Sequence, residues 1–196
     1  MRARLIYSKR GGACFVPHIA LAQMFSRTAS RAGLKLVMTQ GFSPRAKISF
    51  APELPAGVVA LAEVVDMYFD EDVGSDLIPR MNDALPEGFE ISRVMFPPED
   101  SPSLGKFCNY AEYLIRHAFG LDVTRYFRDF GYPVIRCETV NEWTRFVIRE
   151  PARYPIGGFV KDMIKKNIIE GWQDVNIVRV AIGNEYSEYL GSVSMS

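Results

Sequence analysis

The chain has 196 residues, 48% of them apolar and 12% aromatic, and its 23 lysines and arginines balance its 23 aspartates and glutamates. This apolar content is enough for one large hydrophobic core or two small ones. No stretch reaches the roughly 18 to 20 consecutive apolar residues of a membrane span, and the N-terminus has no apolar signal region. We therefore expect a cytoplasmic protein with no membrane partner.

The cysteines do not form a recognisable pattern. Cys14, Cys108 and Cys137 are odd in number and widely spaced, and only two histidines accompany them. No CxxC pair is present, so the ligands for a zinc or iron–sulfur site are missing. We expect no disulfide framework, no metal site and no intrinsic cofactor.

Apolar residues in the first half recur with the periods of strands and helices. Residues 2–8 alternate as in a half-exposed strand, and apolar positions at helical spacing follow Pro17 until Gly33. The pattern then predicts a helix at 75–85 and strands at 34–39, 47–51, 63–69 and 89–96. This order is that of a ferredoxin-like βαββαβ unit with one extra short strand.

A proline-rich stretch at 97–102 reads as a linker, and a second set of elements follows it. The pattern predicts helices at 122–130 and 156–167 and strands at 109–116, 133–139, 145–150 and 175–182. We therefore predict an α+β protein of two tandem ferredoxin-like (βαββαβ) halves with antiparallel sheets. Its parts are a basic-start half at 1–97, a linker at 98–103, a second half at 104–183 and a polar tail at 184–196.

Charge is distributed in blocks. Residues 1–50 contain nine lysines and arginines and no carboxylate, whereas residues 51–100 contain twelve carboxylates and two arginines. A clustered positive field attracts an anionic partner even on a neutral protein. Alternatively, the two blocks neutralise each other across a shared sheet. The sequence leaves both interpretations open.

One segment combines an aromatic, a hydroxyl and two cations in a constrained turn: Gln40, Gly41, Phe42, Ser43, Pro44, Arg45, Ala46 and Lys47. Gly41 permits tight backbone geometry and Pro44 stiffens the loop. Such a loop suits phosphate contact together with base stacking. The alternative is a plain hairpin turn in which Phe42 plugs the core and the cations are solvated.

A second basic turn, at residues 9–12, leads toward the helix that begins near Pro17, and His18 lies in the first turn of that helix. Helix N-termini and nearby cations favour anions. His18 has the chemistry of a general acid or base in phosphodiester cleavage, or it is a hydrogen-bonded structural clasp. We expect the positive charge of this turn and of the loop to converge on one edge of the first half.

The first seventy or so residues carry motifs that resemble those of the radical SAM-linked domain of unknown function, which is fused behind or encoded beside cobalamin-binding radical SAM proteins. These motifs are Tyr7-Ser8-Lys9-Arg10-Gly11, Phe15-Val16-Pro17-His18, Ala32-Gly33-Leu34, Gln40-Gly41-Phe42-Ser43-Pro44, Lys47-Ile48-Ser49-Phe50 and Leu54-Pro55-Ala56-Gly57-Val58. The domain usually shows Ser-His-Leu-Asp at the helix start, where this chain has Pro17-His18-Ile19-Ala20. An acidic partner for His18 is therefore missing there.

The resemblance implies a radical SAM protein as partner, which would itself carry an iron–sulfur cluster, S-adenosylmethionine and cobalamin. It also implies a setting in ribosome and RNA metabolism. More remotely, the element order resembles the tandem ferredoxin-like RNA-processing proteins of CRISPR systems, although fold alone does not carry function.

The leading hypothesis is a non-catalytic RNA-binding accessory module that acts with a radical SAM enzyme. Its candidate nucleic-acid-binding residues are Arg4, Lys9, Arg10, Gln40, Gly41, Phe42, Ser43, Arg45 and Lys47. One alternative is a protein-docking domain that binds the radical SAM partner directly. Another is a metal-independent endoribonuclease with His18 as its catalytic residue.

Overall fold

The computed structural model describes residues 1–117 and 122–184. Its first half contains four strands and two α-helices, at β1 (Arg2–Lys9), α1 (His18–Arg31), β2 (Ile48–Phe50), β3 (Val59–Tyr68), α2 (Leu77–Ala84) and β4 (Phe89–Met95). A short 3-10 helix, η1 (Gly11–Phe15), separates β1 from α1.

After the proline-rich stretch, the chain forms a one-turn helix and a second set of strands and helices. These are α3 (Leu104–Phe107), β5 (Tyr110–His117), α4 (Val123–Asp129), β6 (Val134–Val140), β7 (Trp143–Arg149), α5 (Ile156–Lys165), η2 (Trp172–Asp174) and β8 (Val175–Gly183). The α+β class is therefore confirmed. No helix within the described ranges is long and apolar enough to cross a membrane.

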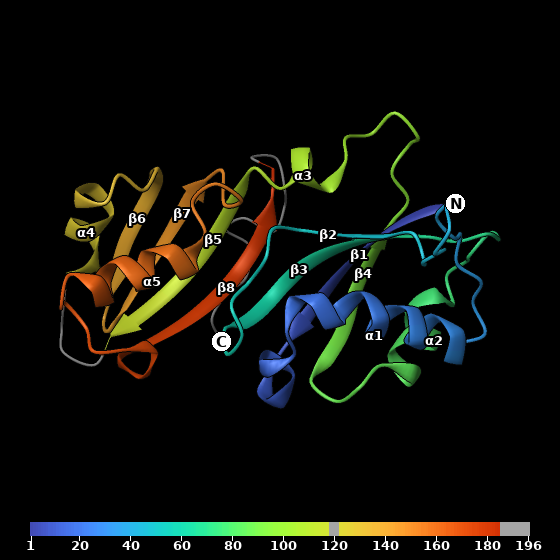
Figure 1. Ribbon diagram of the computed structural model, residues 1–196, viewed down its shortest axis with the longest axis horizontal. Helices are drawn as coiled ribbons and strands as arrows, with labels where there is room; N and C mark the ends of the chain where they lie inside the picture. Colours follow the sequence, from blue (N-terminus) through green and yellow to red (C-terminus); the bar gives the residue numbers. More distant parts are fainter. Residues whose placement is uncertain (118–121, 185–196) are drawn as a thin grey trace.

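All eight strands belong to one open sheet (Figure 1). The order is β4-β1-β3-β8-β5-β7-β6, and β2 pairs with the outer part of β3. Pairing within each half is antiparallel, whereas β3 and β8 run parallel where Val59 lies opposite Val178 and Ala60 opposite Arg179. This parallel junction joins the two halves, and the sequence pattern did not predict it.

Helices cover one face of the sheet (Figure 1). In the first half, Phe25 of α1 packs edge-on against Tyr7 of β1, with ring centroids 5.0 Å apart. In the second, Phe127 of α4 lies 4.4 Å from Phe146 of β7 and 4.5 Å from Phe159 of α5. Each half thus has its own aromatic cluster between helices and sheet, as the alternating apolar positions of the strands require.

The strand expected at 34–39 is reduced to two isolated bridges, Leu36 with Phe69 and Met38 with Ala46. The physical reason is competition for one edge, because β2 occupies the edge of β3 from Val65 to Met67. The segment therefore meets β3 only at its end, where Val37 N donates to Tyr68 O at 2.8 Å. The expected polar tail begins at residue 184, and the part of it from 185 onward lies outside the described residues.

Candidate functional site

The loop at residues 40–47, called here the exposed loop, stands away from the core. Phe42 is fully exposed, and Gln40, Gly41, Ser43, Arg45 and Lys47 are exposed as well. Backbone bonds at the base of the loop hold it, from Thr39 N to Arg45 O (2.7 Å) and from Lys47 N to Val37 O (2.7 Å). The alternative in which Phe42 plugs the core is therefore wrong.

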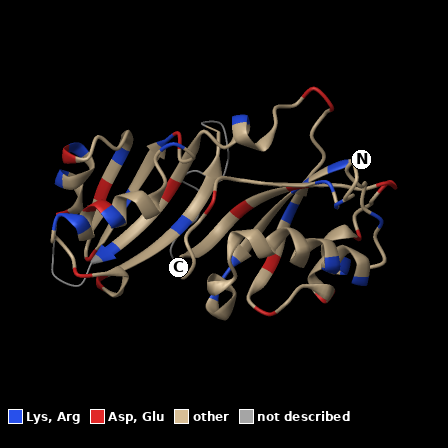
Figure 2. Cartoon of the chain, viewed as in Figure 1, with Lys and Arg blue, Asp and Glu red and all other residues tan. Residues whose placement is uncertain are grey.

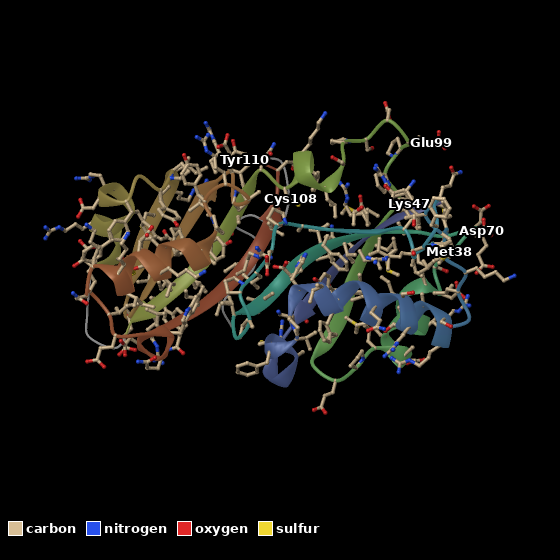
Figure 3. The ribbon with its side chains drawn as sticks, in the orientation of Figure 1. Met38, Lys47, Asp70, Glu99, Cys108 and Tyr110 are labelled. Atoms are coloured by element: carbon tan, nitrogen blue, oxygen red, sulfur yellow. The ribbon has the colours of Figure 1, made fainter. Side chains whose placement is uncertain are left out.

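Lys47 rests against the end of β3, because its Nζ lies 4.2 Å from the centre of the Tyr68 ring. Figure 3 shows Lys47, Met38 and Asp70 at the same end of the first half. Residues 70–72, all carboxylates, follow β3 there. The exposed loop thus combines cations and an aromatic ring with an acidic neighbour, so only part of its positive field is free to attract an anion.

The two basic groups do not converge on one edge. Lys47 lies beside Tyr68, whose register partner is Arg2 at the start of β1, whereas Lys9 at the other end of β1 lies opposite Ala60. The intervening residues of a strand span about 23 Å. The exposed loop and the Lys9–Arg10 turn therefore lie at opposite ends of β1, which corrects the sequence-based expectation.

Arg4 is buried and paired with Asp66 inside the protein. It is 3% exposed, and its Nε and Nη2 donate to the two carboxylate oxygens of Asp66 at 2.8 and 2.9 Å. Nη2 also donates to the carbonyl of Pro102 (3.2 Å), and the guanidinium lies 4.2 Å from the centre of the Phe107 ring. Arg4 therefore ties the linker to β1 and does not present its charge at the surface.

Lys9 is also buried, at 3% exposure, and its Nζ lies 3.4 Å from the carbonyl oxygen of Val16. Burial lowers the pKa of Lys9, and the Glu63 carboxylate opposes that shift. Arg10, the next residue, is exposed, and its backbone N donates to Gly88 O at 2.8 Å. Of this basic turn, Arg10 is the cation placed to meet a partner.

A buried ion pair joins the two halves across the parallel junction. Glu63 of β3 is 5% exposed and Arg179 of β8 is 1% exposed, and two guanidinium nitrogens donate to the two carboxylate oxygens. A third nitrogen of Arg179 donates to Pro52 O at 3.0 Å. Burial disfavours the charge of Arg179, but Glu63 and the hydroxyl of Tyr113 raise its pKa above the ordinary value. Figure 2 shows acidic and basic positions on the central strands of the sheet.

His18, the first residue of α1, lies beside this ion pair. Its ring meets Phe50 edge-on with centroids 5.4 Å apart, and with Tyr7, Lys9 and Glu63 it lines a cavity of about 10 Å³. A cavity of that size holds about one water molecule. Burial lowers the pKa of His18, although the carboxylates of Glu53 and Glu63 act in the opposite direction. The cavity itself has no room for a phosphate group, although His18 is only partly buried.

The depressed pKa of His18 predicts a pH dependence of stability. The unfolded chain takes up this proton near pH 6.5, the ordinary histidine value, whereas the folded protein takes it up only at lower pH. The contribution is therefore fully present above pH 6.5 and is lost as the pH falls toward the folded pKa. Urea unfolding of wild type and His18→Gln at several pH values checks this. The variant should lose less stability than the wild type over that window, and equal losses would contradict the assignment.

A larger cleft of about 610 Å³ lies where the two halves meet, and the sequence did not indicate it. Phe15 of η1, Trp143 of β7 and Trp172 of η2 line it. Arg116 lies over Trp143, 5.5 Å from its ring centre, and forms an ion pair with Glu142 at 3.3 Å. Because the residues come from separate segments, only the tryptophans could have served as a signal. The cleft has the aromatic lining to stack against a planar group.

Metal ligands do not gather in the part of the chain that the structure covers. Among residues 1–117 and 122–184, no group of three His, Cys, Asp or Glu side chains is placed to hold an ion. Cys14 and Cys108 are buried and Cys137 is exposed, and all three are free thiols. Burial raises the pKa of Cys108 to about 12, so its thiol stays protonated at neutral pH.

Most of the chain matches a family model. Residues 2–150 match the family described as "Uncharacterized protein conserved in bacteria (DUF2344)". The chain belongs to this family. This match agrees with the resemblance of the sequence motifs to a domain of unknown function. The link of the DUF2344 chain to radical SAM proteins stays a prediction.

No curated protein matches the chain. Among solved structures, it is similar to the crystal structure of an unknown protein from Galdieria sulphuraria, at 14% sequence identity. The match covers 91% of this chain and 98% of that one, with a TM-score of 0.29. A likeness this low carries no argument about fold or function.

Proposed function

We propose that this DUF2344 protein is a non-catalytic, cytoplasmic RNA-binding module, and that the exposed loop is its contact surface. The observation that supports this proposal is the position of Phe42, whose large apolar ring is fully exposed between polar and cationic neighbours. Exposure of such a ring costs free energy in water, which a stacked nucleobase would relieve. Arg45 and Lys47, exposed on the same loop, supply charge for the phosphates.

We further infer that each half is a ferredoxin-like unit. The strand order β4-β1-β3-β2 in the first half and β8-β5-β7-β6 in the second supports this, because each follows the same 4-1-3-2 arrangement. The sheet of such a unit would serve here as a rigid support for the loop. A rigid base lowers the entropy lost when the loop contacts a ligand.

Binding to a fluorescently labelled single-stranded RNA tests the proposal, followed by anisotropy over a range of salt concentrations. Phe42→Ala should weaken binding by about 1–3 kcal/mol, the usual worth of one aromatic–base stack. Arg45→Ala should lower the slope of log affinity against log salt by about 0.7, because one phosphate contact is removed. Wild type that binds no RNA at low salt would contradict the proposal.

Matched controls separate the loop from general charge and exposed aromatic surface. Arg128→Ala removes an exposed cation of α4 and should leave the salt slope unchanged. Phe15→Ala removes a ring that is 72% exposed at the other end of β1, in the cleft. If Phe15→Ala weakens binding as much as Phe42→Ala, the loop is not the specific contact.

A radical SAM protein is the partner proposed for this module, on the strength of the motif resemblance. The alternative is that the protein docks onto that enzyme without RNA. Co-purification with and without ribonuclease distinguishes the two proposals. A complex that survives nuclease favours direct docking, whereas one that dissociates favours an RNA bridge. The cavity beside His18 does not favour the endoribonuclease alternative, because it cannot accept a phosphate.

A further inference from the structure

β6 ends the sheet on the side away from the junction (Figure 1), and among the described residues no strand pairs with its outer edge. All residues from 135 to 140 are exposed, and two of them are large and apolar, Ile135 at 53% and Val140 at 58% exposure. Such an edge offers unpaired backbone groups to another strand, and proteins normally guard or cover it. Its side chains therefore determine which strand it can accept.

The charges of β6 favour a second copy of itself. Arg136 and Glu138 are two residues apart, so they lie on the same face of the strand, with Cys137 between them on the other face. If two β6 strands pair antiparallel about Cys137, Arg136 of each copy lies opposite Glu138 of the other. Opposite charges directly across a strand pair stabilise it, and like charges destabilise it.

The neighbouring symmetric registers are unfavourable for the same reason. Centring the pair on Arg136 would oppose two arginines, and centring it on Glu138 would oppose two glutamates. Within its own chain, Arg136 lies across from Val147 of β7, whereas Glu138 lies across from Arg145, whose guanidinium bonds Glu112. Val147 carries no charge that could balance Arg136. In the proposed pair, the Glu138 carboxylate of the second copy would supply that negative charge.

We propose that two copies of this chain associate through β6 and continue their sheets into one, with Cys137 of each copy facing the other across a two-fold axis perpendicular to the sheet. This arrangement leaves the helices of both copies on the same face. The proposal is independent of RNA binding, because the exposed loop lies in the other half of the chain.

A charge swap tests the register. Sedimentation velocity of the wild type should show a dimer whose fraction rises with concentration. Arg136→Glu and Glu138→Arg should each shift the chain toward monomer, because each opposes like charges in both pairs. The double variant Arg136→Glu/Glu138→Arg should restore the dimer. Both positions are exposed, so the variants should fold.

Cross-linking provides an independent readout. Paired residues in an antiparallel sheet have Cα atoms about 4.5–5.5 Å apart, within the 4.4–6.8 Å that a disulfide spans. Cys137 is exposed, whereas Cys14 and Cys108 are buried, so oxidation at mildly alkaline pH should link the copies of the wild type and not those of Cys137→Ser. A wild type that stays monomeric at every concentration, a dimer that persists in both single charge variants, or a double variant that stays monomeric would each overturn the proposal.

Discussion

Replacing Arg179 by methionine should lower the free energy of unfolding by about 3–5 kcal/mol, the usual cost of removing one partner of a buried ion pair. Glu63 would remain at 5% exposure, deprived of the two guanidinium donors that satisfy its carboxylate. Pro52 would lose the donor to its carbonyl oxygen as well. Urea denaturation followed by circular dichroism measures the change.

Two further variants identify the cause. Glu63→Gln/Arg179→Met removes the uncompensated charge, so it should recover part of the stability that Arg179→Met loses. Arg125→Met breaks the exposed pair with Asp129, whose atoms are 3.6 Å apart, and should change stability by less than about 1 kcal/mol. If Arg179→Met cost no more than Arg125→Met, the junction pair would not be what couples β3 to β8.

Arg4→Met should likewise destabilise the protein by about 3–5 kcal/mol, because it leaves Asp66 buried at 1% exposure without its bidentate partner. The linker would also lose its bond from Arg4 to Pro102 O. The same variant should leave the salt slope of RNA binding unchanged, in contrast to Arg45→Ala. Unfolding curves and anisotropy measurements on one preparation check both statements.

This comparison separates structural cations from contact cations within the same basic block. A reduced salt slope in folded Arg4→Met would mean that the RNA surface extends to the linker side of β1. Asp66→Asn is the control for stability, since it keeps the shape of the side chain while removing the charge that Arg4 balances. It should also destabilise the protein, because the buried guanidinium would then be uncompensated.

Local periodicity predicted most of the elements, because a strand or helix records its buried face in consecutive residues. β1, α1, β4 and the strands and longer helices of the second half lie close to their predicted ranges, whereas the short helices α3 and η2 were not predicted. The strand prediction for residues 34–39 was wrong for a non-local reason, since their pairing depends on which segment occupies the edge of β3. Composition alone cannot record that competition.

The candidate site was predicted in part. The exposed loop lies at the surface as its turn residues indicated, but Arg4 and Lys9 are buried. Counting charge in the sequence could not show this, because the partner of Arg4 is Asp66, which β1–β3 pairing brings opposite it. The cleft with Trp143 and Trp172 was missed because its walls come from both halves.

The sequence by itself determined the α+β class and the positions of most strands and helices, because these follow from periodicity close along the chain. It left open whether Phe42 lies in the core or at the surface, which the structure decided. Only the tertiary structure decided how the two halves join and which cations remain available. Glu63 and Arg179 are 116 residues apart in the chain, and they meet because β3 and β8 pair in parallel. Strand pairing over such separations depends on the packing of the whole sheet, so it assigns some cations to the interior and leaves Arg10, Arg45 and Lys47 at the surface.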